Sequence, residues 1–176
     1  MGAELATGFD CRACGKHHEI LPLSFSVKAP DAAIRIPEEE QASRVVLTMD
    51  QCVIDQRDHY VRGRIAVPIL DYPDEPFIWG VWAELSPKDF TRTNELWRTE
   101  GRENEPPYTG WLASEIFPYH NTSNLKLRVQ TMPVGRRPHL FIEDGEHPLA
   151  REQRSGITLA RVQEIAELIL HAGDSV

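Results

Sequence analysis

Hydrophobic and polar residues alternate in several short stretches, which is the period of a half-buried β-strand. The alternation is clearest over residues 21–27 and 125–129, and a short apolar run at residues 140–142 predicts another strand. Because proline cannot donate a ladder hydrogen bond, Pro22 predicts that the first of these strands lies at a sheet edge.

Longer stretches predict the centre of the sheet. Residues 59–69 are rich in β-branched side chains, with Gly63 as a bulge or kink. Residues 77–85 are apolar on both faces, as expected for a central strand that is covered on both sides. Residues 44–47 and 51–55 add two brief apolar runs.

Capping residues predict helices in the second half of the chain. Ser86 followed by Pro87 indicates an N-cap and a first helical position, so a helix should run to about Trp97. Residues 148–154 predict a short helix that ends at Gly156. Thr158 caps a last helix. Its apolar face carries Val162, Ile165, Ala166 and Ile169, and its polar face carries Arg161, Glu164 and Glu167.

The remaining segments are polar. Residues 30–43 predict a solvated loop or a short acidic helix, and residues 99–110 predict the longest loop. Strands dominate the middle of the chain and helices its C-terminal part. That order indicates an α+β fold with a largely antiparallel sheet rather than an alternating doubly wound fold. The 176 residues suffice for one domain, residues 1–176, which begins with a zinc-ribbon-like turn at about residues 9–18.

Charge and cysteine content limit the partners and the cellular compartment that are expected. The chain carries 19 basic and 27 acidic residues, a net charge of −8, which disfavours nucleic acid as a partner in the absence of a local basic patch. No apolar run reaches membrane-spanning length, and the first residues lack the features of a secretory signal. Three cysteines, an odd number, fit a reducing compartment, so a cytoplasmic protein is expected.

A Cys-x-x-Cys-Gly motif at Cys11, Cys14 and Gly15 carries the most specific chemistry. Two thiolates at this spacing can bind one zinc ion from a single turn, and glycine tolerates the positive φ of such a turn. The motif supplies half of a tetrahedral site, and Cys52 is the obvious third ligand. His18 is the leading candidate for the fourth. The alternatives are His17, His59 or an acid, with Asp50, Asp55 and Asp58 near Cys52 in sequence.

Other interpretations of the cysteines remain. A thioredoxin-like redox pair normally opens a helix after a strand, whereas here an alternating strand follows Gly15. The three cysteines could also be reduced and buried without binding metal. Four protein ligands would make the zinc structural, whereas three would leave an open position for hydrolytic chemistry.

A second cluster comprises Arg136, Arg137, His139 and His147. His147 stands where the N-cap of the short helix is expected, so these residues predict an anion or ligand surface. The competing interpretation is that His147 only caps the helix and that the arginines pair with nearby acids. The four tryptophans are expected in core and rim packing, with Trp97 partly exposed. The chain contains no nucleophile elbow, P-loop, dinucleotide-binding glycine motif or His-Glu-x-x-His motif.

Four segments together resemble a bacterial family, domain of unknown function 2199. They are Phe9-Asp10-Cys11-Arg12-Ala13-Cys14-Gly15-Lys16-His17-His18, Asp50-Gln51-Cys52-Val53-Ile54-Asp55, Trp79-Gly80-Val81-Trp82 and His147-Pro148-Leu149-Ala150. The resemblance implies one domain and groups Cys11, Cys14 and Cys52 as a set, but it implies no activity.

The sequence therefore predicts a small cytoplasmic binding or interaction protein with a structural zinc site, whose partner could be another protein. The alternative is a metal-dependent or anion-handling enzyme that uses an open zinc position or the Arg136, Arg137, His139 and His147 cluster.

Overall fold

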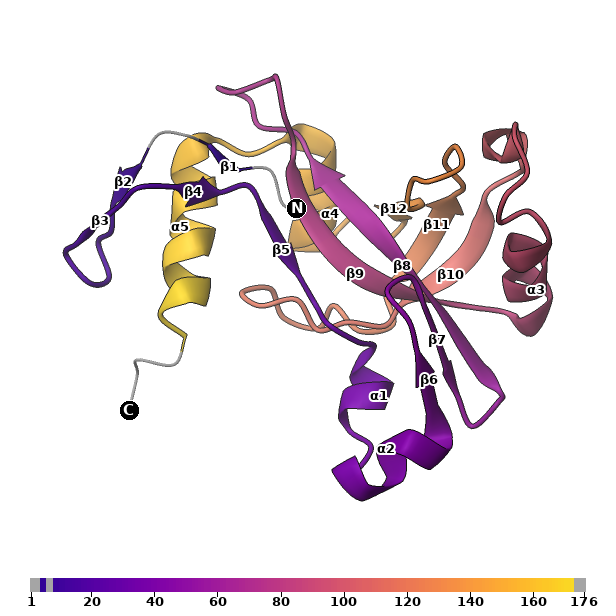
Figure 1. The fold of residues 1–176 in the computed structure, drawn as a ribbon. Coiled ribbons are helices and arrows are strands. Elements are labelled where there is room, and N and C mark those ends of the chain that lie inside the picture. Colours follow the sequence, from indigo (N-terminus) through magenta and orange to yellow (C-terminus); the bar gives the residue numbers. More distant parts are fainter. Residues whose placement is uncertain (1–3, 6–7, 173–176) are drawn as a thin grey trace.

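An eight-stranded sheet organises the computed structural model, which describes residues 4–5 and 8–172 (Figure 1). The strand order is β5-β9-β10-β11-β12-β8-β7-β6. The strands of this sheet are β5 (Ser24–Ser26), β6 (Val45–Leu47), β7 (Gln51–Ile54), β8 (Asp58–Val67), β9 (Phe77–Leu85), β10 (Tyr108–Leu112), β11 (Lys126–Gln130) and β12 (His139–Ile142). Two small hairpin-like pairs lie outside it, β1 (Glu4–Leu5) with β4 (Leu21–Pro22), and β2 (Phe9–Asp10) with β3 (His17–His18).

Five of these strands close into a ring. β9 pairs with both β8 and β10, and β12 pairs with β8, so the path from β8 through β9, β10, β11 and β12 returns to β8. Among the described strands of this sheet, the β5–β9 and β12–β8 pairs are parallel and the others are antiparallel. The expected single-domain α+β fold with a largely antiparallel sheet is confirmed.

The long β8–β9 pair forms the centre of the sheet. β9 is buried along its whole length except at Glu84, and its two tryptophans serve different cores. Trp79 packs into the main core and Trp82 into a second core on the other face. The predicted central strand with two covered faces is therefore confirmed.

Gly63 corrects one expectation. The β8–β9 register runs without interruption past this residue, so Gly63 is not a bulge. A Cβ atom at this position would lie 2.7 Å from Cγ of Leu140 on β12. Glycine is present here because two strands of the ring approach each other closely.

The helices are α1 (Asp31–Ile34), α2 (Glu38–Arg44), α3 (Pro87–Glu95), α4 (Pro148–Ser155) and α5 (Leu159–Leu170), with a 3-10 turn at Arg102–Asn104. The predicted caps are present, since Ser86 accepts from the Asp89 amide and Thr158 accepts from the Arg161 amide. The acidic segment before β6 forms α1 and α2. The loop expected at residues 99–110 instead contains the 3-10 turn and the start of β10.

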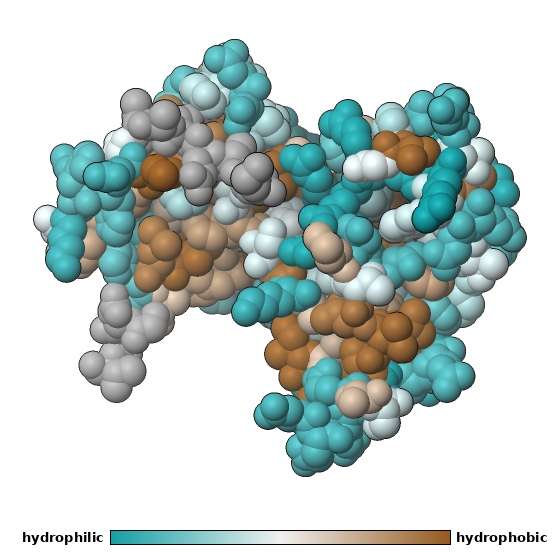
Figure 2. Space-filling view, viewed as in Figure 1, coloured by the Kyte–Doolittle hydropathy of each residue, from teal (hydrophilic) through white to brown (hydrophobic). Residues whose placement is uncertain are grey.

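The two cores differ in size. The main core fills the space between the ring and helices α4 and α5. The second core lies against α1 and consists of Ala29, Ala33, Cys52, Ile54, Tyr60 and Trp82. Figure 2 shows an apolar area over α1 and β6, and these elements carry the exposed side chains of Ile34, Val46 and Leu47.

The N-terminal arm, comprising β1–β4, lies beside the C-terminal helix α5 (Figure 1). β4 contacts α5 directly. This arrangement brings the Cys-x-x-Cys turn next to the end of α5. Within the described residues, no helix is long and apolar enough to cross a membrane.

Candidate metal centre

The Cys-x-x-Cys motif folds as the turn of a small hairpin. β2 and β3 pair in antiparallel register, with Phe9 opposite His18. The Gly15 amide donates to the Cys11 carbonyl at 2.9 Å, and Gly15 takes a φ of +70°. Glycine tolerates this left-handed conformation because it has no Cβ atom. The turn leads into a strand, not into the helix that a thioredoxin-like redox pair would open.

Four side chains converge beside this turn. They are Cys11, Cys14, His18 and His171, and their ligand atoms all lie within 4.8 Å of one another. Cys11 is buried and the other three are half-buried. His18 is held by stacking on Phe9, with ring centroids 4.9 Å apart. This group could hold a metal ion.

The distances suit a tetrahedral ion. Cys11 Sγ lies 3.3 Å from His171 Nε2, and Cys14 Sγ lies 3.4 Å from His18 Nε2. Zinc–sulfur and zinc–nitrogen bonds of about 2.3 and 2.0–2.1 Å place S and N roughly 3.5 Å apart in a tetrahedron. These two sulfur–nitrogen pairs therefore have about the separation that two ligands of one tetrahedral ion would have.

The environment of Cys11 favours its thiolate. Burial acts to raise the pKa of this thiol, but the amides of Cys14 and Ala13 and the side chains of Cys14 and His171 lower it overall. The thiolate is the form that ligates a metal. The same contacts that hold the turn together thus prepare its first sulfur for metal binding.

A separate contact fastens the turn to α5. The Arg12 amide donates to Glu167 Oε1 at 2.8 Å, and Arg12 Nε lies 3.2 Å from Oε2. Gln163 joins this contact by donating to Glu167 and to the Asp10 carbonyl. Glu167, expected on the polar face of the last helix, is only 7% exposed, and its carboxylate accepts these hydrogen bonds. The candidate metal-binding group therefore lies on a hairpin that is packed against α5.

Cys52, the expected third ligand, does not lie with the other two cysteines. It is on β7 and is fully buried in the second core beside Tyr60 and Trp82. Burial raises the pKa of its thiol to about 11, which keeps it protonated at neutral pH. In the structure, His171 completes the group in which the sequence analysis placed Cys52.

The alternative fourth ligands have other contacts. His17 Nδ1 lies 2.8 Å from Asp10, and the His59 ring packs against Phe90. The three acids near Cys52 form ion pairs: Asp50 with Arg137, Asp55 with Arg44 and Asp58 with Arg57. None of these residues belongs to the group at the turn.

The predicted anion surface divides into two parts. Arg136 and Arg137 line a cavity beside β8, and His139 pairs in register with Arg64 of that strand. His147 lies elsewhere. It accepts from the Leu149 amide as the N-cap of α4, and its Nε2 contacts the His120 carbonyl at 2.9 Å.

His171 is the member of this group that the sequence analysis missed. It follows the last turn of α5, and 160 residues separate it from Cys11. A single histidine after an amphipathic helix has no local motif. The one available signal is its spacing of four from Glu167, which places both residues on the same side of α5.

The chain matches a family model described as "Uncharacterized protein conserved in bacteria (DUF2199)" over residues 10–157. It belongs to this family. The matched segment of this DUF2199 protein includes Cys11, Cys14 and His18, and it ends before His171. No curated protein and no solved structure matches the chain.

Proposed function

We propose that this DUF2199 protein is a small binding protein whose two ends are joined by a structural zinc ion. Cys11, Cys14, His18 and His171 would be the ligands. The observation that carries this proposal is the convergence of two thiols and two imidazoles within 4.8 Å from both ends of the chain. Soft thiolates together with imidazoles in a tetrahedral arrangement favour zinc.

The ligand count supports a structural role rather than a catalytic one. A catalytic zinc keeps one position for water or substrate, whereas four protein ligands fill the tetrahedron. A metal-dependent hydrolase with an open zinc position is therefore the less favoured alternative. All three cysteines are free thiols, in keeping with a protein of the reducing cytoplasm.

The binding role is supported by the cavity beside β8, which shares no residue with the group at the Cys11–Cys14 turn. Six arginines line this cavity, together with one acid, Asp50. Asp50 is bonded to Arg137, so the acid is not free to act as a general base. The cavity thus offers groups that bind an anion but, among the described residues that line it, no free base to act on it. This favours a binding protein over an enzyme that acts on an anion.

Cobalt substitution tests the metal site. Metal-free protein titrated with Co²⁺ should develop the intense visible bands of a tetrahedral ion and a thiolate charge-transfer band. Cys52→Ser should give the same spectrum, whereas His171→Ala should change it because water replaces one ligand. Weak octahedral bands without charge transfer in the unsubstituted protein would contradict the proposed ligand set.

A further inference from the structure

The arginine-lined cavity has a volume of about 720 Å³, which is the size of a small-molecule site. It lies between β8, the segment that follows α3, and the loop of residues 131–138. The arginines that line it are Arg62, Arg64, Arg98, Arg102, Arg136 and Arg137. Such a concentration of cations is unexpected in a chain with a net charge of −8.

Arg62 is the most unusual of these residues. Within the part of the chain that the structure describes, its Nε is buried without a hydrogen-bond partner, and its NH1 reaches only the Met49 carbonyl, at 3.5 Å. Its guanidinium lies over the Trp82 ring. Burial and the nearby Arg137 lower its pKa, and Asp50 offsets this only in part. A half-buried cation without an acidic partner costs folding free energy, so a bound anion would be its natural partner.

The neighbouring charges reinforce this site. Arg64 lies two residues further on the same strand face, and Arg136 lies on the adjoining loop. Among the described residues, neither guanidinium has a hydrogen bond or an ion pair. Their effect reaches His139, whose pKa is lowered by burial and by the charges of Arg64 and Arg136. Asp50 pairs with Arg137, but among the described residues no ion pair neutralises Arg62, Arg64 or Arg136.

Arg102 shows that one wall of the cavity is already ordered. Its guanidinium donates to the carbonyls of Met132, Pro133 and Arg136, at 2.8, 3.2 and 2.9 Å. These bonds hold the loop of residues 131–138 against the segment after α3. A loop that is already ordered before the ligand binds does not lose conformational entropy on binding, so the affinity is higher.

We infer that this cavity binds a small phosphate monoester, with its phosphate between Arg62 and Arg64. Planar guanidinium groups match the oxygens of phosphate in paired hydrogen bonds, and several unpaired arginines match a dianion. Ile78, Val129 and Val134 line the rest of the cavity and provide an apolar surface for the organic part. The inference rests on the proposed binding role and does not depend on the zinc ion.

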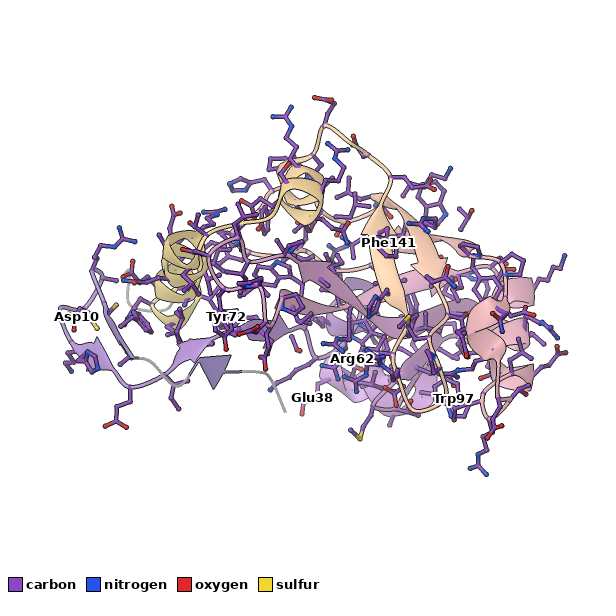
Figure 3. All side chains as sticks on the ribbon, turned by 90° about the horizontal axis from the view of Figure 1, so that it is seen from above. Asp10, Glu38, Arg62, Tyr72, Trp97 and Phe141 are labelled. Carbon is purple, nitrogen blue, oxygen red and sulfur yellow. The ribbon has the colours of Figure 1, made fainter. Side chains whose placement is uncertain are left out.

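The two sites are well separated in space. Figure 3 shows Arg62 and Trp97 on one half of the molecule and Asp10, beside the cysteine turn, at the opposite end. Zinc binding and phosphate binding can therefore be measured independently in the same variant. A loss of one without the other identifies which proposal fails.

Calorimetric titration in a phosphate-free buffer tests the inference with phenyl phosphate, inorganic phosphate and benzoate. Phenyl phosphate should bind saturably to one site, inorganic phosphate more weakly, and benzoate least. Arg62→Gln and Arg64→Gln should each weaken phenyl phosphate binding about tenfold or more. The zinc content of each variant should stay unchanged.

Arg128→Gln is the matched control, because Arg128 lies over the Phe141 ring and does not line the cavity. It removes the same charge and should leave binding within about twofold. Arg62→Gln should also keep or raise the melting temperature, since it removes a half-buried cation that has no ion pair among the described residues. Absent binding of phenyl phosphate, equal binding of benzoate, tighter binding of a single-stranded oligonucleotide, or equal losses in Arg128→Gln would each overturn the inference.

Discussion

The three cysteines lie in two different environments, Cys11 and Cys14 at the hairpin turn and Cys52 in the second core. Cys11 and Cys14 were predictable as a pair because their spacing is itself the geometry of a metal-binding turn, and His18 lies on the returning strand of the same hairpin. Cys52 has the same chemistry, but it lies in an apolar core. Nothing in its neighbouring residues distinguishes these environments, because they depend on how β7 packs against α1.

Serine substitutions should separate the two kinds of cysteine. Cys11→Ser should lower the free energy of unfolding by at least ~3 kcal/mol, because metal binding and folding are coupled. Cys52→Ser should cost about 1–3 kcal/mol through burial of a hydroxyl group in the second core. Thermal melts with and without a chelator distinguish the two causes. The chelator should destabilise the unsubstituted protein and Cys52→Ser, and it should have little effect on Cys11→Ser. A chelator-insensitive unsubstituted protein would contradict this account.

At the scale of elements, local sequence patterns were sufficient to predict a strand or helix where the segment has one consistent pattern or a complete cap. β9 and α3 were predicted closely, because one is apolar on both faces and the other has a complete N-terminal cap. β10 was placed partly in a loop, since Tyr108 and Gly110 lie among polar residues and pair only with distant strands. Closure of the ring is likewise a long-range property that no local pattern records.

Gly63 tests the close approach of strands within the ring. Gly63→Ala should lower the free energy of unfolding by about 1–3 kcal/mol, because its Cβ would overlap the buried Leu140 side chain. Denaturant unfolding measures the change. Leu140→Val has its own cost, but it should reduce the additional cost of Gly63→Ala in the double variant. Strictly additive costs would show that the two side chains do not meet.

The turn that joins β7 to β8 should respond to pH through Asp55. Arg44 donates two hydrogen bonds to this carboxylate, at 2.8 and 2.7 Å, and they lower its pKa. A lowered pKa contributes stability above the unfolded value of about 3.9, and that stability is lost as the pH falls through the folded value. Asp55→Asn should therefore show a smaller fall in melting temperature between pH 6 and pH 3. Asp74→Asn, which removes an exposed carboxyl with no hydrogen bond or ion pair among the described residues, is the control.

At the scale of the whole molecule, the candidate metal group joins residues near both ends of the chain. Cys11 and His171 are separated by 160 residues, and a cross-link over such a span removes about 5 kcal/mol of unfolded-state entropy in the simplest chain model. The sequence could predict half of this site, because the hairpin is local. It could not predict His171, whose position depends on how α5 docks against the N-terminal arm.

The most direct test of the proposed structural zinc site is the zinc content of the natively purified protein. It is measured by plasma mass spectrometry beside the His171→Ala and Cys52→Ser variants. The account predicts one zinc ion per chain in the unsubstituted protein and in Cys52→Ser, and loss of zinc from His171→Ala after mild chelation. Zinc that persists in His171→Ala but is lost in Cys52→Ser would contradict the proposed ligands. Unsubstituted protein purified without zinc would contradict the zinc site as a whole.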